Sequence, residues 1–85
     1  MDPVKVLQRA YQDELLDALR AEGAAQGVPY PHVRALLLEV ARRERAHAEA
    51  LAEALRRRGA PLPPTPKPEE GGWETLLRLL SEEGL

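Results

Sequence analysis

The chain has 85 residues, a formal net charge of −2 and no cysteine. This length allows one small domain at most, and the lack of cysteine excludes disulfide bonds and thiolate metal sites. Charges of both signs are interspersed, which argues against a nucleic-acid partner because such proteins usually carry a basic face. No apolar run approaches about 18 residues and the N-terminus has no signal-peptide pattern, so we expect a soluble cytoplasmic protein without a membrane span.

The first predicted element is a helix from Pro3 to Gln26. This segment has no internal proline and is rich in Leu, Ala, Gln, Glu and Arg, which are good helix formers. Asp2 and Pro3 suit the N-cap and the first helical position. Gly27 is predicted to end the helix, and the following "GVPYP", with its two prolines, indicates a turn.

A second helix is predicted from about Pro31 to about Arg58. Basic residues in its last turn suit the negative end of a helix, and Gly59 is a fitting residue just past that end. The turn between the two helices is short, so the helices are expected to pack side by side as an antiparallel hairpin. No alternating strand pattern occurs in the chain, which predicts an all-α fold.

The rest of the chain divides into a linker and a short helix. Residues 60–72 include "PLPPTPKP", which indicates a stiff, extended linker after the hairpin of residues 1–59. Residues 73–85 are predicted to form a short helix that places Trp73 and three leucines on one side. The proline-rich segment and this helix together are a candidate surface for a protein partner.

Three ionisable residues interrupt the apolar stripes of the two long helices. At about 100° per residue, Glu14 fills the gap in the first stripe between Tyr11 and Ala18. Glu44 and His47 fill the gap in the second stripe, so both are predicted to face inward. Burying an unpartnered carboxylate costs several kcal/mol, so the three groups are expected to be paired, protonated or bound to a cation.

The three residues also lie at one level of the hairpin. Glu14 is about as far before the turn as Glu44 and His47 are after it, at about 1.5 Å per residue. One chain offers only three ligands, and two helices do not enclose a core. Both shortages are removed if two chains pair about a twofold axis into a four-helix bundle with four carboxylates and two histidines at its centre. We therefore predict a homodimer or a higher homo-oligomer.

That arrangement matches the ligand pattern of carboxylate-bridged di-metal bundles, in which two helices give one Glu each and two give Glu-x-x-His. Carboxylate and imidazole ligands favour iron, manganese or zinc. The other interpretation is a metal-free polar cluster in which protonated His47 pairs with glutamates. A histidine near the turn, His32, is predicted to be exposed, and Glu22 is predicted to reach solvent.

Glu14 and the "ERAH" motif of residues 44–47 resemble the ferritin-like and rubrerythrin-like superfamily, and within it the half-ferritin, encapsulated-ferritin-like type. The resemblance implies iron oxidation or storage, or reaction with dioxygen or peroxide, and so a possible ferroxidase or peroxidase activity. It also implies that Glu44 bridges two metals and that Glu14 and His47 are terminal ligands. No catalytic residue is predicted beyond these ligands.

Two further predictions complete this interpretation. Tyr11 lies one turn before Glu14 and is a candidate to hydrogen-bond a ligating carboxylate. The alternative function is a non-enzymatic, metal-free dimeric helical module that binds another protein.

Overall fold

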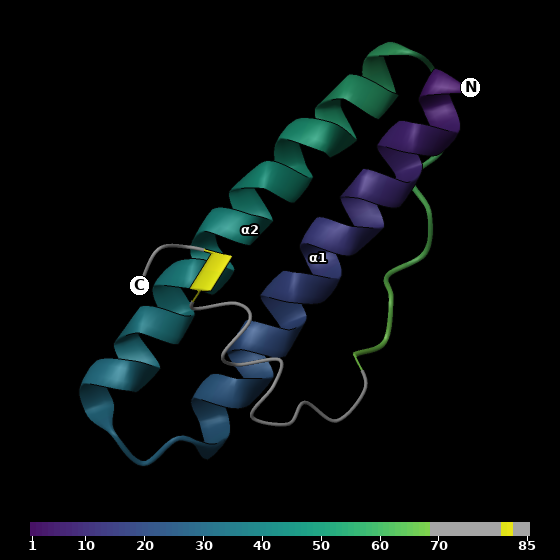
Figure 1. Cartoon of the computed structure of the whole chain (residues 1–85). Helices are drawn as coiled ribbons and strands as arrows, with labels where there is room; N and C mark the ends of the chain where they lie inside the picture. Colours follow the sequence, from purple (N-terminus) through teal and green to yellow (C-terminus); the bar gives the residue numbers. More distant parts are fainter. Residues whose placement is uncertain (69–80, 83–85) are drawn as a thin grey trace.

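The computed structural model describes residues 1–68 and 81–82. Two long helices, α1 (Pro3–Gly27) and α2 (Pro31–Arg57), run antiparallel and lie side by side as a hairpin (Figure 1). The described residues contain no strand, so the predicted all-α hairpin is confirmed. None of the helices in this part of the chain is both long enough and apolar enough to cross a membrane.

Helix α1 begins as predicted but ends for a different reason. The Val4 N–H donates a hydrogen bond of 2.9 Å to the Asp2 carboxylate, which is the expected N-cap. Gly27 still belongs to the helix and does not adopt the left-handed conformation predicted for a glycine cap. The chain turns at Val28 instead, whose extended backbone is the conformation that a following proline imposes. The Arg34 guanidinium donates a hydrogen bond of 2.9 Å to the Val28 carbonyl and so supports this turn.

Helix α2 ends at a glycine cap, as the sequence predicts. Gly59 has φ of +66°, a backbone conformation that only glycine adopts readily. Its N–H donates to the Arg56 carbonyl and the Ala60 N–H donates to the Leu55 carbonyl, both at 3.0 Å. These two bonds are the Schellman arrangement, which satisfies carbonyls that the helix itself leaves unpaired.

Alanines form much of the seam between the two helices. Ala21 packs with Val40 and Ala41, and Ala25 packs with Val28 and Leu37 nearer the turn. The buried residues further from the turn include Ala18, Ala48, Ala52 and Leu55. Small side chains let the two backbones approach closely, so this seam tolerates little added volume.

The observed seam is rotated slightly from the predicted stripes. On α1 it includes Leu15, which is 8% exposed and which the predicted stripe omits. On α2 it is centred on the alanines beside Glu44, so that Glu44 is only half-buried and His47 is exposed. The two polar residues therefore flank the seam on one side of the hairpin and are not enclosed within it.

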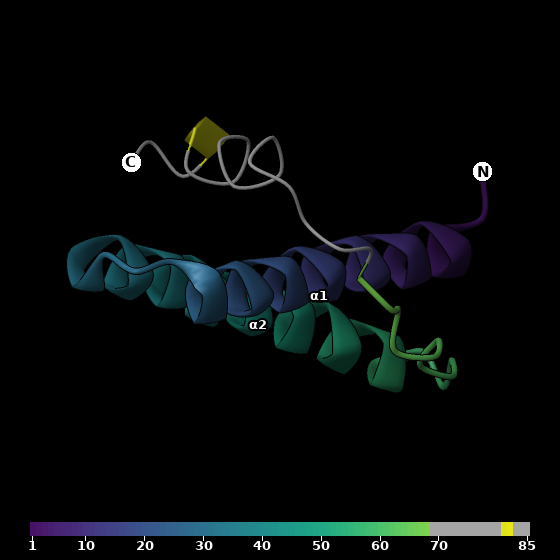
Figure 2. The same ribbon diagram turned by 90° about the horizontal axis from the view of Figure 1, so that it is seen from below.

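After Gly59, residues 60–68 turn back along α1. Figure 2 shows these residues, in green, next to the N-terminal half of α1. Of the predicted C-terminal helix, residues 73–85, only Ser81 and Glu82 are described, and both are helical. The other residues of that prediction lie outside the described part of the chain.

Candidate metal centre

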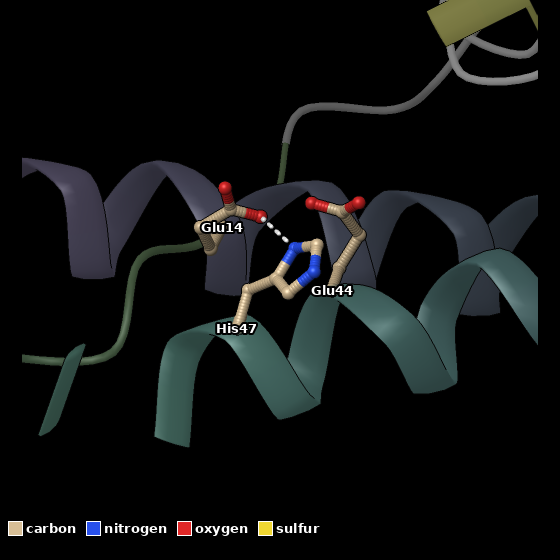
Figure 3. A group of neighbouring side chains, drawn as sticks. All are labelled: Glu14, Glu44 and His47. Atoms are coloured by element: carbon tan, nitrogen blue, oxygen red, sulfur yellow. Dashed lines mark ion pairs between the residues drawn. The ribbon is translucent and has the colours of Figure 1, made fainter. Parts of the chain in front are cut away.

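Three side chains from the two helices converge on one side of the hairpin. They are Glu14 from α1 and Glu44 and His47 from α2, and one ligand atom of each lies within 4.8 Å of the others. In Figure 3 the Glu14 carboxylate and the His47 imidazole point toward one another, with the Glu44 carboxylate beside the ring. The structure thus brings together all three residues that the sequence predicts as ligands.

Local helix geometry explains why these residues meet. Glu44 and His47 are three residues apart, which places their side chains next to one another on one face of α2. The antiparallel hairpin then brings Glu14 of α1 to their level. A carboxylate, a second carboxylate and an imidazole are donors that suit iron, manganese and zinc.

Glu14 carries the least satisfied polar atom of the group. Its Oε2 atom is buried and has no hydrogen-bond partner. The Nδ1 atom of the His47 imidazole lies 3.5 Å from Oε2, beyond good hydrogen-bond length. Leaving a buried carboxylate oxygen without a donor costs about 1–3 kcal/mol. A bound cation would remove that penalty, so the residues present fit a metal ion.

The spacing of the group is slightly wider than one ion requires. Donor atoms at about 2.1 Å from a metal lie at most about 4.2 Å from one another, whereas this group spans up to 4.8 Å. A small rotamer change closes that gap. Such a change is open to His47 because its side chain is 60% exposed, while that of Glu14 is 32% exposed.

Comparison with known proteins agrees with this geometry. The family model described as Rubrerythrin matches residues 5–72, which is most of the 85-residue chain. The chain belongs to the rubrerythrin family. Proteins of this family are ferritin-like and bind metal, usually iron, so the predicted superfamily is confirmed. Neither the search of curated proteins nor that of solved structures finds a match.

The rubrerythrin-family chain has an ion pair that sequence reasoning missed. Arg45 of α2 donates two hydrogen bonds, of 2.6 and 2.8 Å, to Glu22 of α1. Glu22 therefore pairs with α2 and does not simply reach solvent. These hydrogen bonds lower the pKa of Glu22, while partial burial works in the opposite direction. Two other charged residues on that side of α2, Glu39 and Arg42, pair with one another along the helix, as expected on a solvated face.

The remaining sequence candidates lie near this centre without joining it. Tyr11 is half-buried one turn before Glu14, and within residues 1–68 and 81–82 its hydroxyl makes no hydrogen bond. Its role beside a ligating carboxylate stays a prediction. His32 is exposed at the start of α2, where its ring lies 6.4 Å from that of Tyr30. It is distant from the three converging side chains along α2.

Proposed function

We propose that this protein is a ferritin-like di-metal protein whose site forms between two copies of the chain. Glu14, Glu44 and His47 of each copy would surround two metal ions, with iron as the native metal and manganese or zinc as alternatives. The observation that carries the proposal is the buried Oε2 atom of Glu14, which has no hydrogen-bond partner and belongs to the group formed with Glu44 and His47. Membership of the rubrerythrin family supports it.

A second copy accounts for what one hairpin lacks. One chain supplies three ligands, whereas di-metal bundles use four carboxylates and two histidines. The exposed side chain of His47 also leaves the group open on one side.

The chain's own residues have defined tasks at such a site. By resemblance, Glu14, Glu44 and His47 of each copy would hold the two ions, and the four carboxylates would balance the charge of two divalent ions. The imidazole ligates only in its neutral form, so acid weakens binding. Bound iron would supply the redox chemistry, which is the oxidation of Fe(II) by dioxygen or peroxide.

Metal analysis of the purified protein tests the proposal. We expect about two ions per dimer, and a loss of most of this metal in Glu44→Ala and in His47→Ala. Glu53→Ala and His32→Ala are matched controls, because both residues are exposed and lie outside the converging group. The controls should retain wild-type metal content.

Sedimentation of the same samples tests the second copy. We expect a dimer or a multiple of it with metal bound. A protein that binds no iron, manganese or zinc, or that binds metal equally well without His47, would overturn the di-metal function and favour the metal-free interaction module. A metal-loaded monomer would overturn the shared site alone.

A further inference from the structure

The proline-rich segment after α2 has the repeat of a polyproline II helix. Within residues 60–68, Ala60, Pro63 and Pro66 are half-buried, and the six residues between and after them are exposed. Polyproline II has three residues per turn, so every third side chain lies on the same side. The segment therefore turns one face toward the protein along its length. Pro63, on that face, lines a hollow beside α1.

Two glutamines of α1 contact the backbone of this segment. The Gln8 side-chain amide donates a hydrogen bond of 3.0 Å to the Pro61 carbonyl, and that of Gln12 donates one of 3.2 Å to the Pro64 carbonyl. Gln8 and Gln12 are four residues apart and so share a face of α1. Pro61 and Pro64 are three residues apart, so their carbonyls point to the same side. Two successive turns of α1 thus contact two successive turns of the segment.

The composition of the segment explains how two exposed hydrogen bonds can hold it against α1. Each such bond is worth little where water competes for the same groups. For a flexible chain, the conformational entropy lost on ordering would exceed the free energy gained from these two bonds. Proline rings fix φ before docking, so the segment loses little conformational freedom when it docks. In a polyproline II helix the backbone carbonyls make no internal hydrogen bonds and can accept from the glutamines. Its attachment to α2 through Gly59 also makes docking an intramolecular event.

We propose that this face of α1 is a docking surface for a polyproline II segment and that its occupant is residues 60–66 of the same chain. Gln8 and Gln12 bind carbonyls that are three residues apart in the segment. The side chains bordering the hollow around Pro63 include Lys5, Arg9 and Asp13. The sequence suggested a proline-rich ligand for an outside partner. Here the surface that fits the ligand lies in the chain itself.

The docking surface and the metal centre lie on different sides of α1. Gln12 precedes Glu14 by two residues, and about 100° per residue places the two side chains nearly opposite one another. The docked segment thus leaves the side of Glu14 and His47 uncovered. The inference does not depend on metal binding, and its test requires no metal.

Distance measurement between two spin labels tests this inference in the full chain. The chain has no cysteine, so Thr65→Cys and Gly23→Cys give two labelled sites only. Both residues are exposed, and a side chain at Gly23 meets no neighbour. Gln12 and Gly23 are roughly 17 Å apart along the α1 axis at 1.5 Å per residue. A docked segment gives one narrow distance distribution.

Replacing the two amides by carboxylates removes the donors while keeping side-chain shape. We expect Q8E/Q12E to lose the narrow distribution and Q26E, an exposed glutamine of the same helix, to retain it. Dilution with unlabelled protein should leave the narrow distribution unchanged. An unchanged distribution in Q8E/Q12E would overturn the role of the glutamines. Loss of the narrow distribution on dilution would show that the segment comes from a second copy, and would overturn the same-chain occupant.

Discussion

Arg45 of α2 binds both carboxylate oxygens of Glu22 on α1, at 2.6 and 2.8 Å. The pair joins the helices on the side of the seam away from His47, and its two-pronged geometry is the form in which arginine binds carboxylates best. The Glu22 side chain is 32% exposed and that of Arg45 is 49% exposed, so water screens the attraction. The pair therefore adds orientation between the helices and only modest stability.

The free energy of unfolding should fall in acid partly because the Arg45–Glu22 ion pair is lost. The hydrogen bonds from Arg45 lower the pKa of Glu22 below 4.5 in the folded state. Its contribution is therefore present above about pH 4.5 and is lost as pH falls through the lowered folded-state value. We expect Glu22→Gln to lower the free energy of unfolding at pH 7 by up to about 1 kcal/mol. At pH 3 the difference from wild type should be smaller, as measured by urea unfolding.

A double-mutant cycle controls for unrelated effects of that change. Arg45→Met alone should lose a similar amount, and the double variant should lose little more than either single variant. Additive losses at pH 7 would contradict an energetic link between the two side chains.

The Glu14 carboxylate should limit the stability of the metal-free protein. Its Oε2 atom is buried without a donor, so Glu14→Gln removes a buried charge. We expect the metal-free variant to be as stable as wild type or up to about 2 kcal/mol more stable, with metal binding reduced. Thermal unfolding in a chelator at pH 7 measures this.

The metal-free interpretation predicts the opposite sign for the same variant. If Glu14 pairs with a protonated His47, Glu14→Gln removes the pair and destabilises the protein in chelator. Glu53→Gln, an exposed position on α2, shows the effect of the same chemical change away from the centre.

The alanine seam should resist added volume. Ala21 is fully buried against Val40 and Ala41, so Ala21→Leu forces the helices apart. We expect a loss of about 1–3 kcal/mol in the free energy of unfolding. Ala46→Leu, on the exposed side of α2, should change it by less than about 0.5 kcal/mol. Equal stability of the two variants in urea would show that the seam is loosely packed.

Local signals in the sequence were sufficient to predict the hairpin and the convergence of the three candidate ligands. The cap at Asp2 and the glycine at Gly59 each act within one helical turn, so they can be read from neighbouring residues. The convergence of Glu14 with Glu44 and His47 follows from helical periodicity and from the distance to the turn. Helical periodicity fixes a direction only to within tens of degrees, and for that reason the prediction placed His47 in the interior.

Contacts between distant residues could not be read in the same way. The Arg45 side chain is 49% exposed, and its length lets the guanidinium reach Glu22 on the other helix. The bonds from Gln8 and Gln12 join residues more than fifty positions apart. Glutamines at this spacing are common in helices, so no local pattern marks them as contacts for the proline-rich segment.

Replacement by alanine should change the free energy of unfolding in opposite directions at Gly23 and Gly59, because their backbone conformations differ. A Cβ atom meets no neighbour within 4 Å at Gly23 or at Gly59, so packing does not distinguish them. Gly23 is helical, and Gly23→Ala should raise the free energy of unfolding by about 0.5–1 kcal/mol. Gly59 has φ of +66°, and Gly59→Ala should lower it by about 1–2 kcal/mol because a side chain crowds the following carbonyl. For a domain of this size, 1 kcal/mol shifts the melting temperature by roughly 4–8 °C. Melting curves that move in the same direction would show that the glycine at the end of α2 does not hold the left-handed conformation in solution.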